Sequence, residues 1–270
     1  GFAPLNTPST RLFRNPGNWP VFAEIATVIA PLFVIAGIGF GWARSGRPFD
    51  TDMIAALGTN FGVPCLIFAS LTRLEISPGT FGWITLAYVA VIALNLAVGG
   101  LILRAAKLEA GVYLPPLTFP NSGNMGLPLC LFAFGEPGLA LAMSPLLIAV
   151  IGNVTIGVAL ATGRVSLRQL FRNPYLYVVT AALIFMATDT ALPRWIAGTT
   201  EIIGGSAIPL MLMALGVTLA RLEVRNIRRS VMLAVVRLAL GFCFGFAVAE
   251  LFGFTGVTRG VLILQSAMPV

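Results

Sequence analysis

The segment 115–128 holds the residues best suited to binding a ligand. It reads PPLTFPNSGNMGLP, with four Pro and two Gly in fourteen residues. Each Pro removes a backbone donor and clashes with the carbonyl four residues earlier, so this stretch cannot form one straight helix. Inside a membrane, the freed backbone groups need protein, water or a ligand as partners. Amides and hydroxyls gather at the same break, namely Thr118, Asn121, Ser122 and Asn124.

An unwound helix of this kind suits an anionic group or a small ion near the middle of the membrane, because it offers amides, hydroxyls and the N-terminus of a half-helix. The alternative is a packing kink that Ser and Asn side chains cap. We favour ligand binding because a second break, at Pro269, is flanked by Gln265 and Ser266. Secondary transporters bind their substrates between paired broken helices.

Three Asn residues lie within or near other apolar runs. Asn153 stands in LLIAVIGNVTIGVAL, where an amide either bonds a neighbouring helix or binds substrate, and both roles stay open. Asn60 and Asn95 are expected to form interhelical hydrogen bonds.

Three ionisable side chains also fall within or near apolar runs: Glu24, Arg237 and Glu250. An intramembrane charge is a functional candidate by default. All three nevertheless lie within about three turns of a predicted helix end, where a long side chain can reach the interface. We therefore expect interfacial roles, and single out Arg237 as the possible counter-ion of an anionic substrate.

Composition places these residues in a membrane. Of the 270 residues, 57% are hydrophobic and 10% are charged, whereas soluble domains carry about 25% charged residues. So few charges could not cover the surface of a soluble protein of this size. The composition excludes a cytosolic enzyme, a secreted disulfide scaffold and a disordered chain, and it indicates an integral protein of the lipid bilayer.

The residue inventory narrows the function further. There is no His, which excludes a His-ligated zinc or haem site and a Ser-His-Asp triad. No GxxxxGK[ST] loop is present, so an ATP-driven pump is not expected. With no His and few carboxylates in the apolar runs, we also expect neither an enzyme nor a bound cofactor. The net charge of +7 comes mostly from Arg in short gaps, which form no stripe for nucleic acid. The three Cys, all in apolar runs, are expected to be small core residues.

A helix that crosses a bilayer needs about 20 mostly apolar residues. The sequence contains nine such runs, which predict an all-α fold: 20–43, 53–71, 81–103, 110–134, 137–162, 174–192, 199–220, 230–252 and 256–270.

Lys and Arg alternate between the gaps that separate these runs. The first, third, fifth and seventh gaps hold 11 of them, whereas the lead-in 1–19, the even gaps and the start of the ninth run hold five. Cytoplasmic loops carry the excess of positive charge. We therefore expect the odd gaps in the cytoplasm, the N-terminus outside, and a multi-pass protein of the cytoplasmic membrane.

The chain also contains an internal repeat. VPCLIFASLTRLE from Val63 and IPLMLMALGVTLARLE from Ile208 share a Pro and a closing Arg-Leu-Glu at an offset of 145 residues, and Pro120 and Pro269 lie 149 residues apart. Units of five spans have opposite orientations in the membrane, which makes an inverted repeat. The expected boundaries are 1–19 for an extracytoplasmic lead-in, 20–163 for the first repeat and 164–270 for a second repeat truncated before its last helix.

The run PNSGNMGLPL resembles the Pro-Asn-[Thr/Ser]-x-x-Met-Gly-[Ile/Leu]-Pro-Leu motif of the auxin efflux carrier family. That family includes the plant PIN-FORMED carriers and bacterial organic-acid permeases, and is related to the bile-acid sodium symporters. Further matches, over residues 21–270, are VPCLIFASL with Pro64, LFRNPYLYV, AIPLMLMALGVTLA and LILQSAMPV. The resemblance implies a ten-helix transporter of two inverted five-helix repeats, split into a scaffold and a transport domain, with helices 4 and 9 crossing at Pro120 and Pro269.

The resemblance also implies a substrate class and a site. Family members move small carboxylates, and their motif Asn, which corresponds to Asn121, lies at the substrate carboxylate. The polar position of their fifth helix is similar to Asn153, and the bile-acid relatives bind sodium near the crossing. The implied substrate-binding residues are Asn121, Ser122, Gly123, Asn124, Asn153 and Pro64. The ion or proton candidates are Thr118, Asn124, Gln265 and Ser266.

We therefore expect a secondary carrier of a small organic anion that works by elevator-type alternating access. Uniport, proton coupling and sodium coupling all stay open, and a homodimer is possible. The alternatives are a transport-dead sensor or channel-like protein on the same scaffold, and a sodium-coupled symporter like those for bile acids.

Overall fold

The computed structural model describes residues 21–73, 77–164, 168, 171–188, 192–222 and 227–269. Within these ranges every regular element is a helix, as the composition predicts. The lead-in 1–19, the side chain of Glu24 and Val270 lie outside the described part of the chain.

The first five predicted spans are built from helical pieces. The first span is α1 (Val21–Arg44), the second joins α2 (Thr51–Leu57), the π-helical turn η2 (Gly58–Gly62) and α3 (Val63–Arg73), and the third is α4 (Pro78–Ala105). The fourth and fifth follow as α5 (Ala110–Thr118), η3 (Ser122–Gly126), α6 (Leu127–Gly152), η4 (Asn153–Gly157) and α7 (Val158–Thr162). Gly135, at φ 68° and ψ −161°, interrupts α6 and separates these two spans, because only glycine adopts this conformation without strain.

The remaining spans are α9 (Pro174–Ala187), α10 (Arg194–Arg221), α11 (Ile227–Leu251) and α12 (Gly256–Ser266). Across the described residues, six helical stretches are long and apolar enough to cross a membrane, and one of them, Ala110–Thr162, contains two predicted spans. All nine predicted runs therefore coincide with helices. The structure is that of an all-α integral membrane protein.

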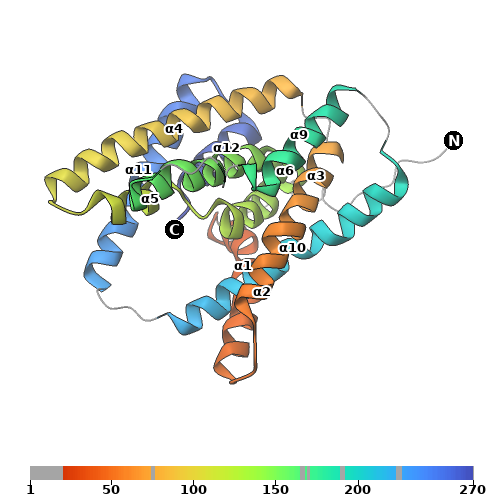
Figure 1. Cartoon of the computed structure of the whole chain (residues 1–270), viewed down its shortest axis with the longest axis horizontal. Helices are drawn as coiled ribbons and strands as arrows, with labels where there is room; N and C mark the ends of the chain where they lie inside the picture. Colours follow the sequence, from red (N-terminus) through yellow and green to blue (C-terminus); the bar gives the residue numbers. More distant parts are fainter. Residues whose placement is uncertain are drawn as a thin grey trace.

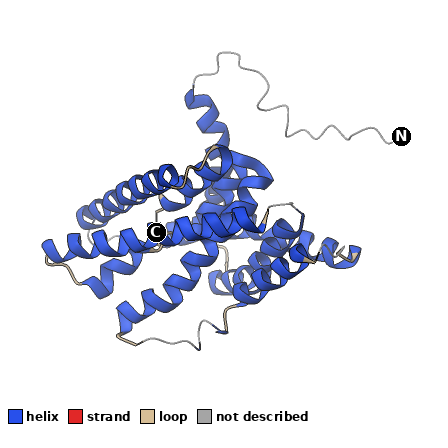
Figure 2. Cartoon of the chain, turned by 90° about the horizontal axis from the view of Figure 1, so that it is seen from above, coloured by secondary structure: helices blue, strands red, loops and turns tan. Residues whose placement is uncertain are grey.

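The helices pack in two groups (Figures 1 and 2). In the first bundle, α1 packs on α10, α10 on α3, and α3 on α9. In the second bundle, α4 packs on α5, α6 and α11, and α12 packs on both α6 and α11. The two bundles meet where α6 contacts α1 and α3, and where η3 contacts α10. Each bundle takes helices from both halves of the chain, while the repeat boundaries 20–163 and 164–270 stay a prediction.

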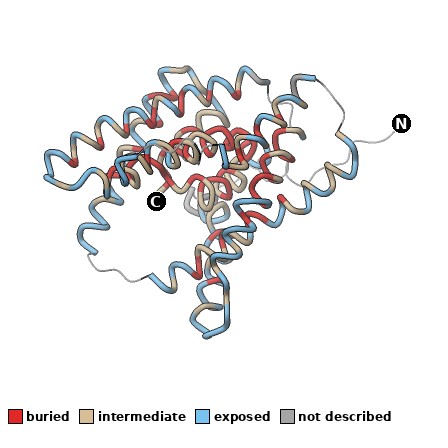
Figure 3. Tube along the Cα trace, viewed as in Figure 1, coloured by how far each residue is buried: buried red, intermediate tan, exposed pale blue. Residues whose placement is uncertain are grey.

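Burial follows this arrangement. The largest apolar cluster spans both bundles, from Leu32 of α1 to Val261 of α12, and buried residues concentrate at the centre of the molecule (Figure 3). Large apolar side chains such as Phe33, Ile202 and Leu251 are exposed on the outside, where lipid suits them. Cys243 is also exposed. The expectation of three core cysteines is therefore wrong for Cys243, because this part of α11 faces outward.

Glycine lets α1 and α10 touch backbone to backbone. A Cβ atom on Gly216 of α10 would overlap the carbonyl group of Ala36, and a Cβ atom on Gly39 of α1 would overlap that of Met213. Small residues allow such close approach between membrane helices, where van der Waals packing contributes much of the association energy. These two positions fix the spacing of the first bundle.

Candidate functional site

The two predicted breaks meet in the structure. Helix α5 ends at Thr118 and α12 ends at Ser266, each just before its Pro. The backbone N–H of Asn121 donates a hydrogen bond to the carbonyl oxygen of Pro269, with an N···O distance of 2.8 Å. The expected crossing at Pro120 and Pro269 is therefore present, and each break satisfies a backbone group that the other exposes.

Asn121 holds a tight turn at this crossing. Its φ of −74° and ψ of 63° are those of an inverse γ-turn, and the N–H of Ser122 accordingly donates to the carbonyl of Pro120 at 2.8 Å. The Oδ1 atom of Asn121 accepts a hydrogen bond from the N–H of Asn124 at 3.1 Å and so caps η3. The Nδ2 atom has no hydrogen-bond partner within the described residues. One N–H₂ group at the crossing is thus left for a ligand.

The residues that follow Asn121 face in different directions. Ser122 is buried, and its Oγ atom lies 3.4 Å from the hydroxyl oxygen of Tyr88 on α4. Gly123 is half-buried, and a Cβ atom there would meet the side chain of Met211 on α10. The crossing touches the first bundle through this contact of η3 with α10. Asn124 is half-buried.

Three ion-site candidates are buried side chains at the C-terminal ends of α5 and α12. Thr118 and Gln265 are fully buried, and Ser266 is 1% exposed. The atoms Thr118 Oγ1, Gln265 Oε1 and Ser266 Oγ have no hydrogen-bond partner among the described residues. The Nε2 atom of Gln265 lies 3.7 Å from the Sγ atom of Cys130, to which it donates. Unpartnered buried oxygens cost free energy, and they lie at the C-terminal ends of α5 and α12, where the helix dipole favours a cation.

Two predicted substrate residues lie away from the crossing. Asn153 is exposed at the start of η4, and its Oδ1 atom lies against Gly157. Pro64 is buried at the start of α3 and lines an apolar groove of about 390 Å³ with Tyr177 of α9 and Thr200 of α10. No hydrogen bond joins Asn153 to Asn121 in the described structure, so their common role stays a prediction.

Asn60 and Asn95 do not join helices as expected. The Nδ2 atom of Asn60 donates to the carbonyl of Ala56 at 2.8 Å, and that of Asn95 donates to the carbonyl of Val91 at 2.9 Å. Each partner is four residues earlier in the same helix, where a short polar side chain reaches the backbone without help from a neighbour. The interhelical interpretation is therefore wrong for both.

The ionisable residues Glu250 and Arg237 differ in their exposure. Glu250 is exposed and forms an ion pair with Arg259, in agreement with an interfacial role. Arg237 is only 2% exposed, so it does not reach the interface, and the expected interfacial role is wrong for this residue. The reason is packing, because this face of α11 lies against α4 and α12. The Nη1 atom of Arg237 is held beside Gly241, one turn further along the helix.

A cavity of about 330 Å³ lies between α5 and α11. We call it the α5–α11 cavity. Arg237 lines it, and Pro269 of the crossing forms part of its wall. The other lining residues are Tyr113, Pro116, Leu117, Ser230, Leu233 and Ala234.

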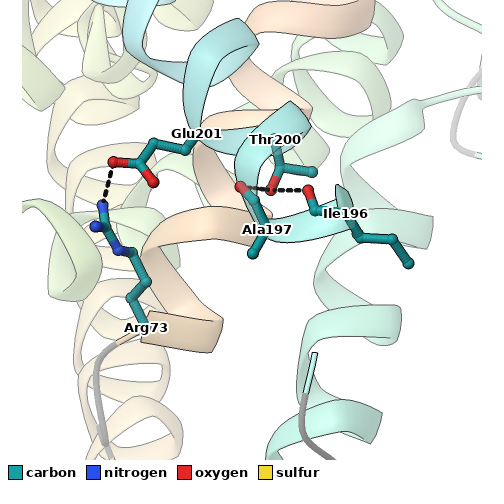
Figure 4. Close-up of polar contacts among 5 residues, drawn as sticks. All are labelled: Arg73, Ile196, Ala197, Thr200 and Glu201. Carbon is teal, nitrogen blue, oxygen red and sulfur yellow. Dashed lines mark hydrogen bonds and ion pairs between the residues drawn. The ribbon is translucent and has the colours of Figure 1, made fainter. Parts of the chain in front are cut away.

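A second cavity, of about 310 Å³, lies between the two bundles and is called the interbundle cavity. Its charged lining consists of Arg73 of α3, Glu201 of α10 and Glu136 of α6. Figure 4 shows Arg73 reaching Glu201, with an Nη1···Oε1 distance of 3.1 Å, beside Thr200, whose hydroxyl donates to the carbonyl of Ile196. Both charged side chains are more than half exposed. Such a pair contributes about 0–1 kcal/mol to stability.

Sequence reasoning missed these three charged residues as site residues. Arg73 lies in the Arg-Leu-Glu match that identifies the repeat, but its partner Glu201 is 128 positions later in the chain. The only signal was that both residues stand at the ends of apolar runs predicted to lie on the same side of the membrane.

Comparison with known proteins shows the family to which the chain belongs. The family described as "Membrane transport protein" matches residues 24–165 and 158–270. The chain belongs to this family. It is thus a membrane transport protein, and the resemblance to the auxin efflux carriers is confirmed at that level. The relation to bile-acid symporters stays a prediction.

Two archaeal transporters are similar to this membrane transport protein. An uncharacterized transporter of Methanothermobacter thermautotrophicus is 26% identical over 235 residues, which cover 82% of this chain and 76% of the relative. An uncharacterized transporter of Methanocaldococcus jannaschii is 24% identical over 159 residues, which cover 55% of this chain and 52% of the relative. These relatives support transport as the function and name no substrate.

Proposed function

We propose that this protein is a secondary carrier of a small organic carboxylate, and that the second bundle moves against the first around the crossing. The observation that carries the proposal is the hydrogen bond of 2.8 Å between Asn121 N–H and Pro269 O. It brings two broken helices together at a point where η3 contacts α10 of the other bundle. Broken helices that meet between bundles are the usual substrate site of secondary transporters.

The chemistry of the crossing favours an anion on one side. The helical segment that begins at Ser122 has its N-terminus at the crossing, and the partial positive charge there attracts a carboxylate. The Nδ2 group of Asn121 adds a donor with no partner in the described structure. Asn121 would therefore bind the carboxylate, and Met211 with the apolar residues of α3 and α10 would enclose the rest of the substrate.

Ion coupling would use the C-terminal ends of α5 and α12, in contrast to the helix N-terminus that attracts the carboxylate. Thr118, Gln265 and Ser266 offer neutral oxygens, and the described residues contain no group of three or more acidic, His or Cys side chains that could hold a metal ion. A weakly bound sodium ion fits neutral oxygens at helix C-termini. Proton coupling lacks a buried carboxylate among the described residues, since Asp50, Asp52, Glu109, Glu136, Glu201 and Glu250 are all exposed.

Gradient-driven uptake tests this function. The purified protein is reconstituted in liposomes, and uptake of labelled acetate, malonate, malate and indole-3-acetate is measured under imposed gradients of sodium, protons and potential, one at a time. The proposal predicts saturable uptake of at least one acid. A sodium gradient that drives this uptake would support the ion site. Absence of saturable flux for every acid, in protein with a cooperative thermal melt, would contradict the carrier and favour a sensor.

A further inference from the structure

We propose that the α5–α11 cavity is a binding site for a small carboxylate and that Arg237 supplies its positive charge. This site lies inside the second bundle. It is therefore distinct from the contact between the bundles on which the proposed function rests. The cavity has a volume of about 330 Å³, which accommodates a ligand of a few carbon atoms.

The first argument is the state of Arg237. The residue is 2% exposed, and its Nε and Nη1 atoms make no hydrogen bond within the described residues. Arginine stays charged under all physiological conditions. A buried charge without a partner costs several kcal/mol, so such a side chain is normally paired or binds an ion.

The second argument is that the described protein supplies no counter-charge. Its two ion pairs are Arg73 with Glu201 and Arg259 with Glu250, and neither involves Arg237. Every carboxylate whose side chain the structure describes is exposed, and none lines this cavity. No described side chain therefore neutralises Arg237, and the proposal assigns that negative charge to a ligand.

The third argument is electrostatic. The rim of the α5–α11 cavity carries a second cation, because the Nη1 atom of Arg229 donates to the hydroxyl of Tyr113 at 3.1 Å. The interbundle cavity, in contrast, has two carboxylates and one arginine in its lining. Since fields focus in clefts with low-dielectric walls, the α5–α11 cavity concentrates anions and the interbundle cavity does not.

The position of Arg237 also links the cavity to the crossing. The cavity runs along α11 from Ser230 to Arg237, which are seven residues or about 10 Å apart along the helix axis. Both the Nη1 atom of Arg237 and the carbonyl oxygen of Ser266 approach the missing Cβ position of Gly241. The Arg237 guanidinium therefore lies beside the C-terminus of α12, where the helix dipole favours its positive charge, and a ligand would bind on its cavity side, next to Pro269.

Thermal stability with added anions tests this site without depending on transport. Melting temperatures of the full chain in detergent are measured with sodium malonate, acetate and chloride at matched ionic strength. Ligands that bind only the folded state raise the melting temperature with the logarithm of their concentration. We expect such a rise with a carboxylate and a smaller one with chloride. We expect the same in the matched control Arg228→Met, since Arg228 is exposed on the same helix.

The melts are made in the Asn121→Asp background, in which the crossing no longer binds a carboxylate, and in this background the Arg237→Met variant should lose the carboxylate-dependent rise. Its melting temperature without carboxylate should equal or exceed that of the Asn121→Asp protein, because Met fills the space of the arginine stem and removes a buried charge. Arg237→Lys keeps the charge and should keep a weaker rise. The site is wrong if the Asn121→Asp protein shows no rise, if chloride acts as strongly as malonate, or if Arg237→Met responds to carboxylate as the control does. Flux without this rise would leave the proposed function standing, and a rise without flux would leave only the site.

Discussion

Replacing Asn121 by Asp is expected to reduce carboxylate transport more than about tenfold while the fold persists. Asp caps a helix as well as Asn does, so the hydrogen bond from Asn124 N–H, now 3.1 Å long, is retained. The free N–H₂ group becomes a carboxylate oxygen, which repels the substrate. Loss of a hydrogen bond to a charged group costs about 1.5–3 kcal/mol, or about tenfold or more in affinity.

The matched control is Asn60→Asp. Asn60 lies in the π-helical turn η2, is exposed, and donates only to the carbonyl of Ala56 one turn earlier. The Asp variant introduces the same charge and loses this one local hydrogen bond. Initial uptake rates in proteoliposomes, normalised to the amount of folded protein, should stay close to those of the unmodified protein. Undiminished uptake by Asn121→Asp would show that the substrate does not meet this side chain.

The substitution Gly216→Ala is expected to destabilise the protein, whereas Gly205→Ala on the same helix is expected to stabilise it. A Cβ atom at Gly216 overlaps the Ala36 carbonyl, while one at Gly205 meets nothing within 4 Å. Overpacking costs about 1–3 kcal/mol. In open space, Ala is more favourable than Gly in a helix by about 0.5–1 kcal/mol.

Thermal or denaturant melts of the two variants in one detergent measure this difference. The pair share the same chemical change and the same helix, so their opposite signs isolate the contact between α1 and α10. Equal shifts in both variants would mean that the two helices are not in backbone contact at Gly216.

Much of the fold could be predicted because its causes are local. Runs of apolar residues longer than a bilayer crossing and breaks at Pro act within a few residues of chain, so the nine spans and the ends of α5 and α12 follow from the sequence. The meeting of Pro120 and Pro269 follows from the resemblance to a family, since nothing local brings together residues 149 positions apart.

The misassigned side chains depend on contacts between distant segments. Arg237 lies near enough to a helix end to reach the interface, and only the packing of α11 on α4 and α12 shows that it is buried. For Asn60 and Asn95 the prediction is wrong for the opposite reason, because a distant partner was expected and the actual partner is local. Their partners are local backbone carbonyls, which compete successfully with a neighbouring helix. Polar residues in apolar runs thus indicate a site, but their partners depend on the tertiary structure.

Exchange across the membrane tests the central claim most directly, namely that this membrane transport protein is a carrier whose substrate binds at the crossing of its two breaks. Proteoliposomes are loaded with an unlabelled acid found to be transported, and uptake of the same labelled acid is measured with no ion gradient. A carrier predicts that internal acid accelerates uptake of the label, and that Asn121→Asp abolishes this acceleration while Asn60→Asp does not. Uptake that is indifferent to internal acid, or exchange that survives Asn121→Asp, would contradict the account.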